Sequence, residues 1–231
     1  MTLAIMQPYF FPYLGYFQLM READTFVFYD DVSYIKGGWI NRNSILSLNG
    51  PTRITLQVTG ASSNKKINQV GVGANRLALI KTIAQAYAKA PYAAEIMVLI
   101  ERCLTHEGDN LAEFLAFTLE QTARFIGLET RFITSSSLDI DPALSGPDRV
   151  LAVCHALDAA RYINPIGGAQ LYDKAAFGDA GLELGFLQPR LSPYPQYRRT
   201  GDFVPSLSII DALMFLGPGG LAAQLASYDI V

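Results

Sequence analysis

The side chains best suited to chemistry in this chain are two adjacent carboxylates, Asp30 and Asp31, which directly follow a short apolar and aromatic run, 25–29. The run predicts a buried strand, and the carboxyl end of a parallel strand is a common place for functional groups. Two carboxylates there could hold a magnesium ion, accept a hydrogen bond from a hydroxyl or act as a general base. The alternative is a structural role, because acids often stabilise turns and helix N-termini.

The twelve residues after this acid pair are rich in side chains that bind ligands. Lys36 and Arg42 could neutralise phosphate or carboxylate charge, and arginine can do so through two parallel hydrogen bonds. Glycines at 37–38 would let the backbone approach a ligand closely. We therefore predict a loop that encloses a ligand, with Lys36 joining the acid pair in catalysis. The residues predicted to contact substrate in this loop are Tyr34, Trp39, Asn41, Arg42 and Asn43.

The segment 5–18 reads Ile-Met-Gln-Pro-Tyr-Phe-Phe-Pro-Tyr-Leu-Gly-Tyr-Phe-Gln and is dense in aromatic residues. Proline cannot donate to a strand ladder, so the apolar start at 3–6 predicts a strand that ends in a rigid turn. A helix over 14–22 follows, and open α/β sheets bind ligands at such junctions. We expect this turn and the loop 30–43 to line one pocket. The predicted substrate contacts in the turn are Gln7, Tyr9, Tyr13 and Tyr16.

For Gln7 a structural role is the alternative, since a side-chain amide can also fix a turn. The tyrosines are favoured over the neighbouring phenylalanines as pocket residues, because their hydroxyls need hydrogen-bond partners.

A further candidate contact lies at 164–168, Asn-Pro-Ile-Gly-Gly, between a short predicted strand and a predicted helix. A glycine turn at a helix N-terminus can bind an anion, so we predict that Asn164, Gly167 and Gly168 contact substrate. A turn that only connects two elements is the alternative.

Asp211 lies on a predicted helix that is otherwise apolar. A buried acid must have a partner, and we expect an arginine or a backbone turn to supply one.

Composition excludes several classes of protein. The net charge of −3 and the pI near 5.4 give no basic footprint for nucleic acid. Two cysteines, Cys103 and Cys154, argue against a disulfide framework and favour a reducing cytoplasm. No signal peptide or long apolar run is visible, so we expect no membrane segment. A mean hydropathy of +0.20 leaves room for a homo-oligomer interface. No Cys, His or Asp cluster has zinc spacing, so no metal ligand is assigned.

The order of predicted elements favours an α/β fold. Two strand-like runs, 44–48 and 52–58, flank Asn49-Gly50, which is a strong hairpin signal. Helical periodicity follows over 74–89, 92–106 and 110–126. Strands at 130–134, 162–164 and 184–187 then alternate with helices at 147–158 and about 170–179, before a final helix at 207–216 and a short tail helix. This alternation predicts a mostly parallel, Rossmann-like sheet. We expect one domain, 1–231, with 74–127 as a helical insertion or subdomain.

Several of these segments together resemble the WbqC-like family. The matching pieces are 5–18, then Phe-Tyr-Asp-Asp-Val-Ser-Tyr-Ile-Lys-Gly-Gly-Trp-Ile-Asn-Arg-Asn at 28–43, Tyr-Ile-Asn-Pro-Ile-Gly-Gly at 162–168 and Ser-Ile-Ile-Asp-Ala-Leu at 208–213. The resemblance covers nearly the whole chain, and the first two pieces are its most specific part. It implies a bacterial cytoplasmic protein linked with the synthesis of O-antigen or another lipopolysaccharide or surface polysaccharide. It assigns no catalytic residues.

The resemblance, together with the predicted loop, leads to one favoured hypothesis and two alternatives. The favoured one is a transferase or ligase that attaches an acyl or aminoacyl unit, such as glycine, to an amino sugar or sugar nucleotide. Asp30 or Asp31 would act as base or hold Mg²⁺ with ATP, although a thioester or charged tRNA could equally supply the donor. The acidic pI argues against tRNA. The alternatives are a non-catalytic sugar-nucleotide-binding or scaffold protein and a glycosyltransferase.

Overall fold

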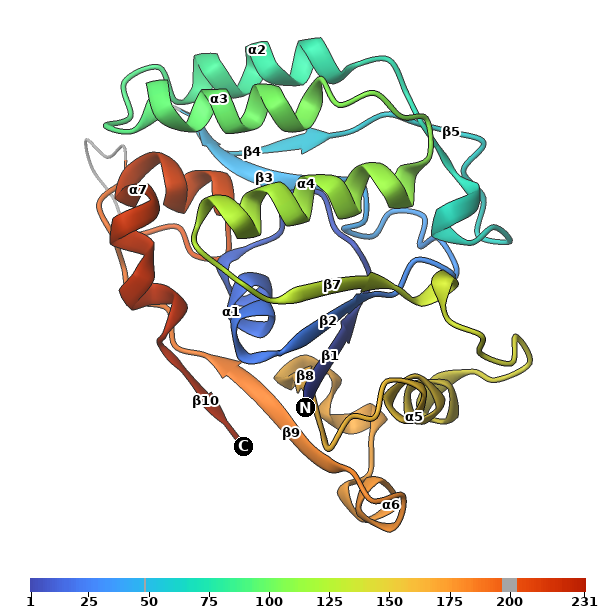
Figure 1. The fold of residues 1–231 in the computed structure, drawn as a ribbon. Helices are drawn as coiled ribbons and strands as arrows, with labels where there is room; N and C mark the ends of the chain where they lie inside the picture. The colour runs from blue at the N-terminus through green and yellow to red at the C-terminus, as the bar shows by residue number, and fades with distance from the viewer. Residues whose placement is uncertain (48, 197–202) are drawn as a thin grey trace.

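The centre of the molecule is a six-stranded sheet with the strand order β10-β9-β8-β1-β2-β7 (Figure 1). The computed structural model describes residues 1–47, 49–196 and 203–231. The strands of the sheet are β1 (Thr2–Met6), β2 (Thr25–Phe28), β7 (Arg131–Thr134), β8 (Arg161–Pro165), β9 (Glu183–Pro189) and β10 (Tyr228–Ile230).

The sheet is parallel except at its edge, where β10 pairs antiparallel with β9. The chain starts in the middle at β1, adds β2 and β7 on one side, and then adds β8 and β9 on the other. This is a doubly wound order, in which the direction of winding reverses between β1 and β8. The predicted mostly parallel, Rossmann-like α/β fold is therefore confirmed. The three-residue strand β10 was not predicted, because so short a segment has no visible period.

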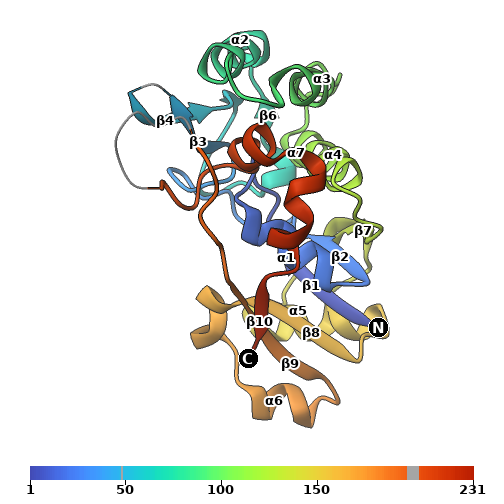
Figure 2. The same ribbon diagram turned by 90° about the vertical axis from the view of Figure 1, so that its left-hand side faces the viewer.

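Side chains of the central strands alternate between the two faces of the sheet, as the pleat requires. Leu3, Ile5 and Val27 pack with α5 and α6 in one buried cluster. Ala4 and Phe26 belong to a larger cluster on the other face, with α1 and α7. Figure 2 shows α7 in front of α1. The covering helices are α1 (Leu14–Glu22), α5 (Gly146–Ala156), α6 (Lys174–Asp179) and α7 (Ile209–Leu225).

The chain between β2 and β7 forms two short antiparallel pairs and three α-helices, which lie above the sheet in Figure 1 and supply many residues of the larger cluster. The hairpin predicted at Asn49-Gly50 is confirmed, since β3 and β4 pair across it; Leu48, at the end of the predicted first strand, lies outside the described residues. Whether this part is an insertion or a subdomain stays a prediction. Its elements are β3 (Arg42–Ser47), β4 (Gly50–Thr55), β5 (Val58–Thr59), β6 (Gly71–Val72), α2 (Arg76–Ala86), α3 (Ala93–Leu104) and α4 (Leu111–Phe125).

The helix predicted over about 170–179 is instead a 3₁₀ helix, Ile166–Leu171, followed by the six-residue α6. The long final helix α7 consists of two helical parts joined at Gly217, whose φ of 65° breaks the helix before Pro218. These parts match the predicted final helix and tail helix. No helix in the described part of the chain has both the length and the apolar character to cross a membrane.

Candidate functional site

The five parallel strands β9, β8, β1, β2 and β7 have their carboxyl ends along one edge of the sheet, and doubly wound proteins bind ligands at this edge where the direction of winding reverses. Met6 at the end of β1 pairs with Phe28 at the end of β2, and Phe28 pairs with Thr134 at the end of β7. The turn after β1, the loop after β2 and the segment 164–168 after β8 therefore all begin at this edge (Figure 1).

A cavity of about 350 Å³ forms where the turn after β1 meets the loop that leads into β3. The amide N–H of Phe10 donates to the Ile40 carbonyl at 2.9 Å, and Asn43 Nδ2 donates to the Phe11 carbonyl at 2.7 Å. Residues of both predicted segments thus line one cavity. The lining residues are Tyr9, Pro12, Tyr13, Trp39, Asn43 and Ser206. Two wider depressions of about 560 Å³ contain none of the predicted site residues.

Unusual backbone conformations occur on both sides of this cavity. Phe11, between two of its lining residues, has φ of 40°, and the lining residue Ser206 has φ of 57°. Non-glycine residues seldom adopt such values, which persist where surrounding contacts enforce them. Here Ser208 Oγ donates to the Phe11 carbonyl at 2.7 Å, and the Ile209 N–H donates to the Pro12 carbonyl at 2.8 Å. The start of α7 therefore holds the aromatic turn in its strained shape.

The cavity presents aromatic faces and neutral polar groups. Trp39 is 52% exposed and forms an accessible ring on its wall. Burial raises the pKa of the Tyr9 and Tyr13 hydroxyls above the ordinary value, so both stay protonated at neutral pH. Neutral hydroxyls can donate as well as accept, and aromatic rings pack against flat, weakly polar surfaces. A sugar ring or a nucleobase fits this chemistry better than a small ion does.

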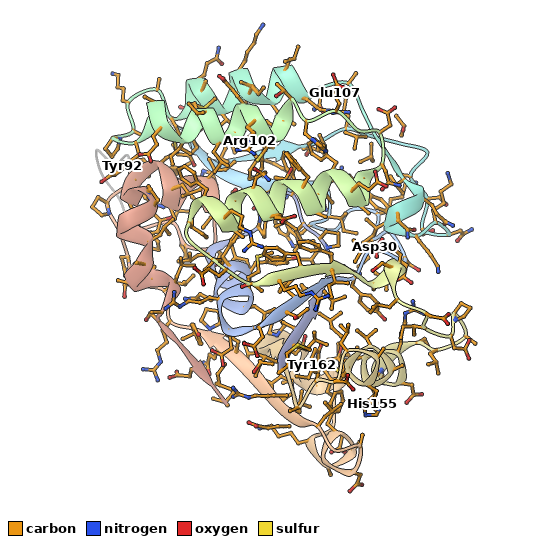
Figure 3. The ribbon with its side chains drawn as sticks, viewed as in Figure 1. Asp30, Tyr92, Arg102, Glu107, His155 and Tyr162 are labelled. Atoms are coloured by element: carbon orange, nitrogen blue, oxygen red, sulfur yellow. The ribbon has the colours of Figure 1, made fainter. Side chains whose placement is uncertain are left out.

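Asp30 lies outside the cavity lining and is only 4% exposed. Both of its carboxylate oxygens accept hydrogen bonds from the turn after β7. The Ser136 N–H donates to Oδ1 at 2.9 Å, and the Ser136 hydroxyl donates to Oδ2 at 2.6 Å. The Ser135 hydroxyl lies 3.0 Å from Oδ1, but its single proton is shared with Asp31. Asn68 Nδ2 also donates to Oδ2, at 3.3 Å. Figure 3 shows Asp30 beside this turn.

Asp31 is paired with a buried arginine from α5. Arg149 contacts Asp31 Oδ2, and the Ser135 hydroxyl donates to Oδ1 at 2.5 Å. The side chains of Asp31 and Arg149 are 10% and 7% exposed. A magnesium ion at this acid pair would have to replace these donors, and the described residues contain no group of three His, Cys, Asp or Glu side chains that could hold a metal. The arrangement matches the structural alternative for the two acids more closely than a free base.

Three predicted substrate contacts lie inside the protein. The Tyr16 hydroxyl donates to the Gln7 carbonyl at 2.8 Å, and the Tyr34 hydroxyl donates to Asn41 Oδ1 at 2.9 Å. Asn41 Nδ2 in turn donates to the Leu56 carbonyl at 2.7 Å. Tyr16, Tyr34 and Asn41 are buried and do not line the cavity, and their hydrogen bonds hold the turn and the loop in place. Their predicted contact with substrate stays a prediction.

Gln7, Lys36 and Arg42 are close in sequence to residues of the cavity lining but do not line the cavity themselves. Gln7 is half-buried, and its Oε1 accepts from the Tyr9 hydroxyl at 3.5 Å, which supports a positioning role. Lys36 is exposed. Arg42 is partly buried, and its Nε has no hydrogen-bond partner within the described residues.

The two glycines after β8 lie in the first turn of the short 3₁₀ helix Ile166–Leu171. Asn164 is buried and accepts from the Tyr162 hydroxyl at 3.2 Å. A Cβ on Gly168 would lie 2.2 Å from Asn164 Nδ2, so this glycine makes room for a side chain of the protein itself. Gly167 has open space around it. This packing supports the connecting-turn alternative, and the predicted contact of Asn164, Gly167 and Gly168 with substrate stays a prediction.

Sequence reasoning missed the partners of the acids. The Thr-Ser-Ser-Ser run at 134–137, directly after a predicted strand, was the available signal for the serines around Asp30. Arg149 gave no signal, because it is one cation within a helix. The expected arginine or backbone partner of Asp211 is also wrong. Its carboxylate accepts from two tyrosine hydroxyls and one amide, belonging to Tyr87, Tyr194 and Gln196.

The fold and the cavity define a Rossmann-like α/β protein with an aromatic cavity at the carboxyl edge of its sheet. The chain belongs to the WbqC-like protein family, whose model matches residues 7–222. It is similar to Rv1507c of Mycobacterium tuberculosis, which is described as an uncharacterized protein; the two are 28% identical over 220 residues, which is 93% of each chain. No solved structure matches the chain.

Proposed function

We propose that this protein binds an amino sugar or sugar nucleotide in the aromatic cavity and attaches an acyl or aminoacyl unit, such as glycine, to the sugar amine. Its setting would be the cytoplasmic synthesis of a bacterial surface polysaccharide such as O-antigen. The observation that carries the binding part is the cavity itself, with three aromatic side chains, three neutral hydroxyls and one amide around about 350 Å³. Pockets for small molecules combine apolar walls with a few fixed polar groups in this way.

The proposed transfer forms an amide bond between the sugar nitrogen and the carbonyl carbon of the donor. The bond from that carbon to its leaving group breaks, and the nitrogen loses one proton. The donor must therefore be activated, as an acyl adenylate made from ATP, a thioester or an aminoacyl-tRNA. Asp31 could accept the proton only after giving up Ser135 or Arg149. We therefore propose that the acid pair holds the loops at the edge of the sheet in place, and that solvent or the leaving group accepts the proton.

A non-catalytic sugar-nucleotide-binding protein is the second candidate. The specific observation in its favour is that none of the six residues around the cavity is charged at neutral pH. A glycosyltransferase is a third reading, and it predicts release of nucleotide from a sugar nucleotide without ATP or an amino acid.

Binding is tested first, by measuring the melting temperature with a panel of sugar nucleotides and free nucleotides. A ligand that binds only the folded state raises the melting temperature by mass action. We expect a selective rise for sugar nucleotides that is lost in Trp39→Ala and kept in Val98→Ala, which removes an exposed side chain on α3. An equal rise in melting temperature for both variants would exclude the aromatic cavity as the binding site.

Turnover is tested separately, by incubating the protein with glycine, ATP and an amino-sugar nucleotide and measuring product mass and pyrophosphate. Product formation that survives Asp30→Asn supports the transferase with a structural acid pair. Binding without product supports the second candidate, and nucleotide release without ATP supports the third.

A further inference from the structure

Charge is distributed unevenly along this chain. No Asp or Glu occurs among the 63 residues 32–94, whereas eight Lys and Arg do. The remaining residues hold all 21 acids and only ten of the 18 cations. The acidic pI therefore conceals a segment of net charge +8 inside a protein whose other residues carry −11. This segment contains the loop that walls the cavity, the hairpin β3–β4, the loop 60–66 and α2.

Four of these cations belong to two neighbouring segments, the loop 32–43, which contributes to the cavity wall, and 65–66. The Tyr34 N–H donates to the Lys65 carbonyl at 2.8 Å, and Ser33 forms a β-bridge with Lys66. Both segments lie beyond the carboxyl ends of β1, β2 and β7 (Figure 1). In the described part of the chain, no acidic side chain forms an ion pair with any of the four. They are Lys36, Arg42, Lys65 and Lys66.

The tip of the cavity loop adds exposed apolar side chains to this charge. The Gly38 N–H donates to the Ile35 carbonyl at 3.0 Å, which closes a turn with Lys36 and Gly37 at its centre. Gly37 has φ of 78°, as the third position of such a turn requires. Ile35 and Trp39 flank the turn, and each is 52% exposed. A tryptophan and an aliphatic side chain next to a lysine are the components of a membrane-interface anchor.

We propose that the turn 35–39 inserts into the interfacial layer of an anionic phospholipid bilayer, with the cations of the acid-free segment facing the headgroups. Lysine and arginine near such a surface are attracted to its negative potential, while tryptophan resides at the headgroup level. Because Trp39 also lines the cavity, insertion brings the cavity wall to the membrane surface. A lipid-linked sugar could then reach the cavity directly.

The observations favour a bilayer over RNA as the anionic partner. Exposed Ile35 contributes nothing to phosphate or base recognition but gains free energy in an apolar layer. A flat bilayer also contacts only one face, so the acidic remainder of the protein can point away from it. A nucleic acid would benefit from cations along its whole path.

Trp39 is the only tryptophan of the chain, so its fluorescence reports on this turn without labelling. The experiment titrates the full-length protein with vesicles of equal parts phosphatidylcholine and phosphatidylglycerol, and with vesicles of phosphatidylcholine alone. We expect a blue shift of emission and quenching by brominated lipid with the anionic vesicles only, and both effects should weaken with added salt.

Paired variants then distinguish vesicle binding by the turn from non-specific adsorption of the protein. Ile35→Ser and the double variant Lys36→Glu/Lys65→Glu should each lower vesicle affinity, the double variant by at least about tenfold. Val98→Ser and Arg131→Glu change exposed residues outside the acid-free segment and should leave it unchanged. Circular dichroism checks that each variant is folded.

The proposal is overturned if Trp39 emission is unaffected by anionic vesicles, or if the turn and control variants bind them alike. Salt-sensitive binding of a single-stranded RNA oligonucleotide without vesicle association would assign the cations to nucleic acid instead. Vesicle binding requires no substrate, so its failure leaves the proposed function untouched.

Discussion

The aromatic cavity and the Asp30–Asp31 cluster begin at the same edge of the sheet but are built in opposite ways. The cavity is open, its lining side chains are neutral, and strained backbone lies on both sides of it. The acid cluster is closed, and each carboxylate oxygen accepts a hydrogen bond or contacts a cation within the protein. The difference indicates that the charged groups at this edge satisfy one another inside the protein, whereas the uncharged cavity leaves its polar groups accessible, as the proposed binding of a ligand requires.

The largest effect is expected from removing the cation of the cluster. Arg149→Met leaves Asp31 buried and unpaired, so the free energy of unfolding should fall by about 3–5 kcal/mol. Urea denaturation measures this loss. The double variant Asp31→Asn/Arg149→Met should recover most of it, and no recovery would mean that Arg149 acts through packing alone.

A smaller loss of stability is expected from Asp30→Asn, because an amide N–H would then face hydroxyl and amide donors. We expect a cost of about 1–3 kcal/mol. Ligand affinity should change little. A stable Asp30→Asn protein that no longer binds sugar nucleotide would contradict the division between cluster and cavity.

The cavity should respond in the reverse way. Trp39→Ala should change the free energy of unfolding by no more than about 0.5 kcal/mol, since the ring is half exposed. Binding of a sugar nucleotide should weaken about tenfold, because one stacked aromatic face contributes about 1–3 kcal/mol. Calorimetric titration measures the affinity. A Trp39→Ala protein that is destabilised but binds with normal affinity would show that Trp39 stabilises the fold and does not contact the ligand.

The smallest effect concerns Asp211, a buried acid held by neutral donors. Burial raises the pKa of Asp211 above its ordinary value of 3.8, so the folded state binds more protons than the unfolded state. Stability from this group is present below the unfolded pKa and is lost as pH rises through the folded pKa. The stability of the wild type relative to Asp211→Asn should therefore decline as pH rises from about 4, in urea unfolding at several pH values. A difference that is constant with pH would show that Asp211 is not protonated on folding.

Much of the fold could be predicted because its signals are local. The aromatic turn and the hairpin each span fewer than about twenty residues, and each strand or helix of the alternating part shows its own period within its own length. The shared cavity also followed from the sequence, since two strand ends on neighbouring parallel strands meet at one edge. For residues in or directly after a strand, the sequence position was enough to predict where in the fold they lie.

The partners of individual side chains could not be predicted, because they come from distant segments. Asp30 and Ser135 are 105 residues apart, and Asp31 and Arg149 are 118 apart. The pattern of residues 30–43 predicted a ligand-binding loop, but Tyr34 and Asn41 satisfy one another inside it. A polar side chain that becomes buried needs a hydrogen-bond partner, but the sequence alone does not show whether that partner is a ligand or another part of the protein.

The hydrogen bond from Ser208 to the aromatic turn has a consequence for how the protein is made. Ser208 Oγ and the Phe11 carbonyl are 197 residues apart, and Ser208 also donates through its N–H to the Ser44 carbonyl. Contacts of such separation form after local ones, because the intervening chain must first be ordered. A chain still emerging from the ribosome therefore lacks the aromatic cavity until nearly all of it has been synthesised, and truncations before Ser208 should lose the cavity together with the part of the larger cluster that α7 supplies.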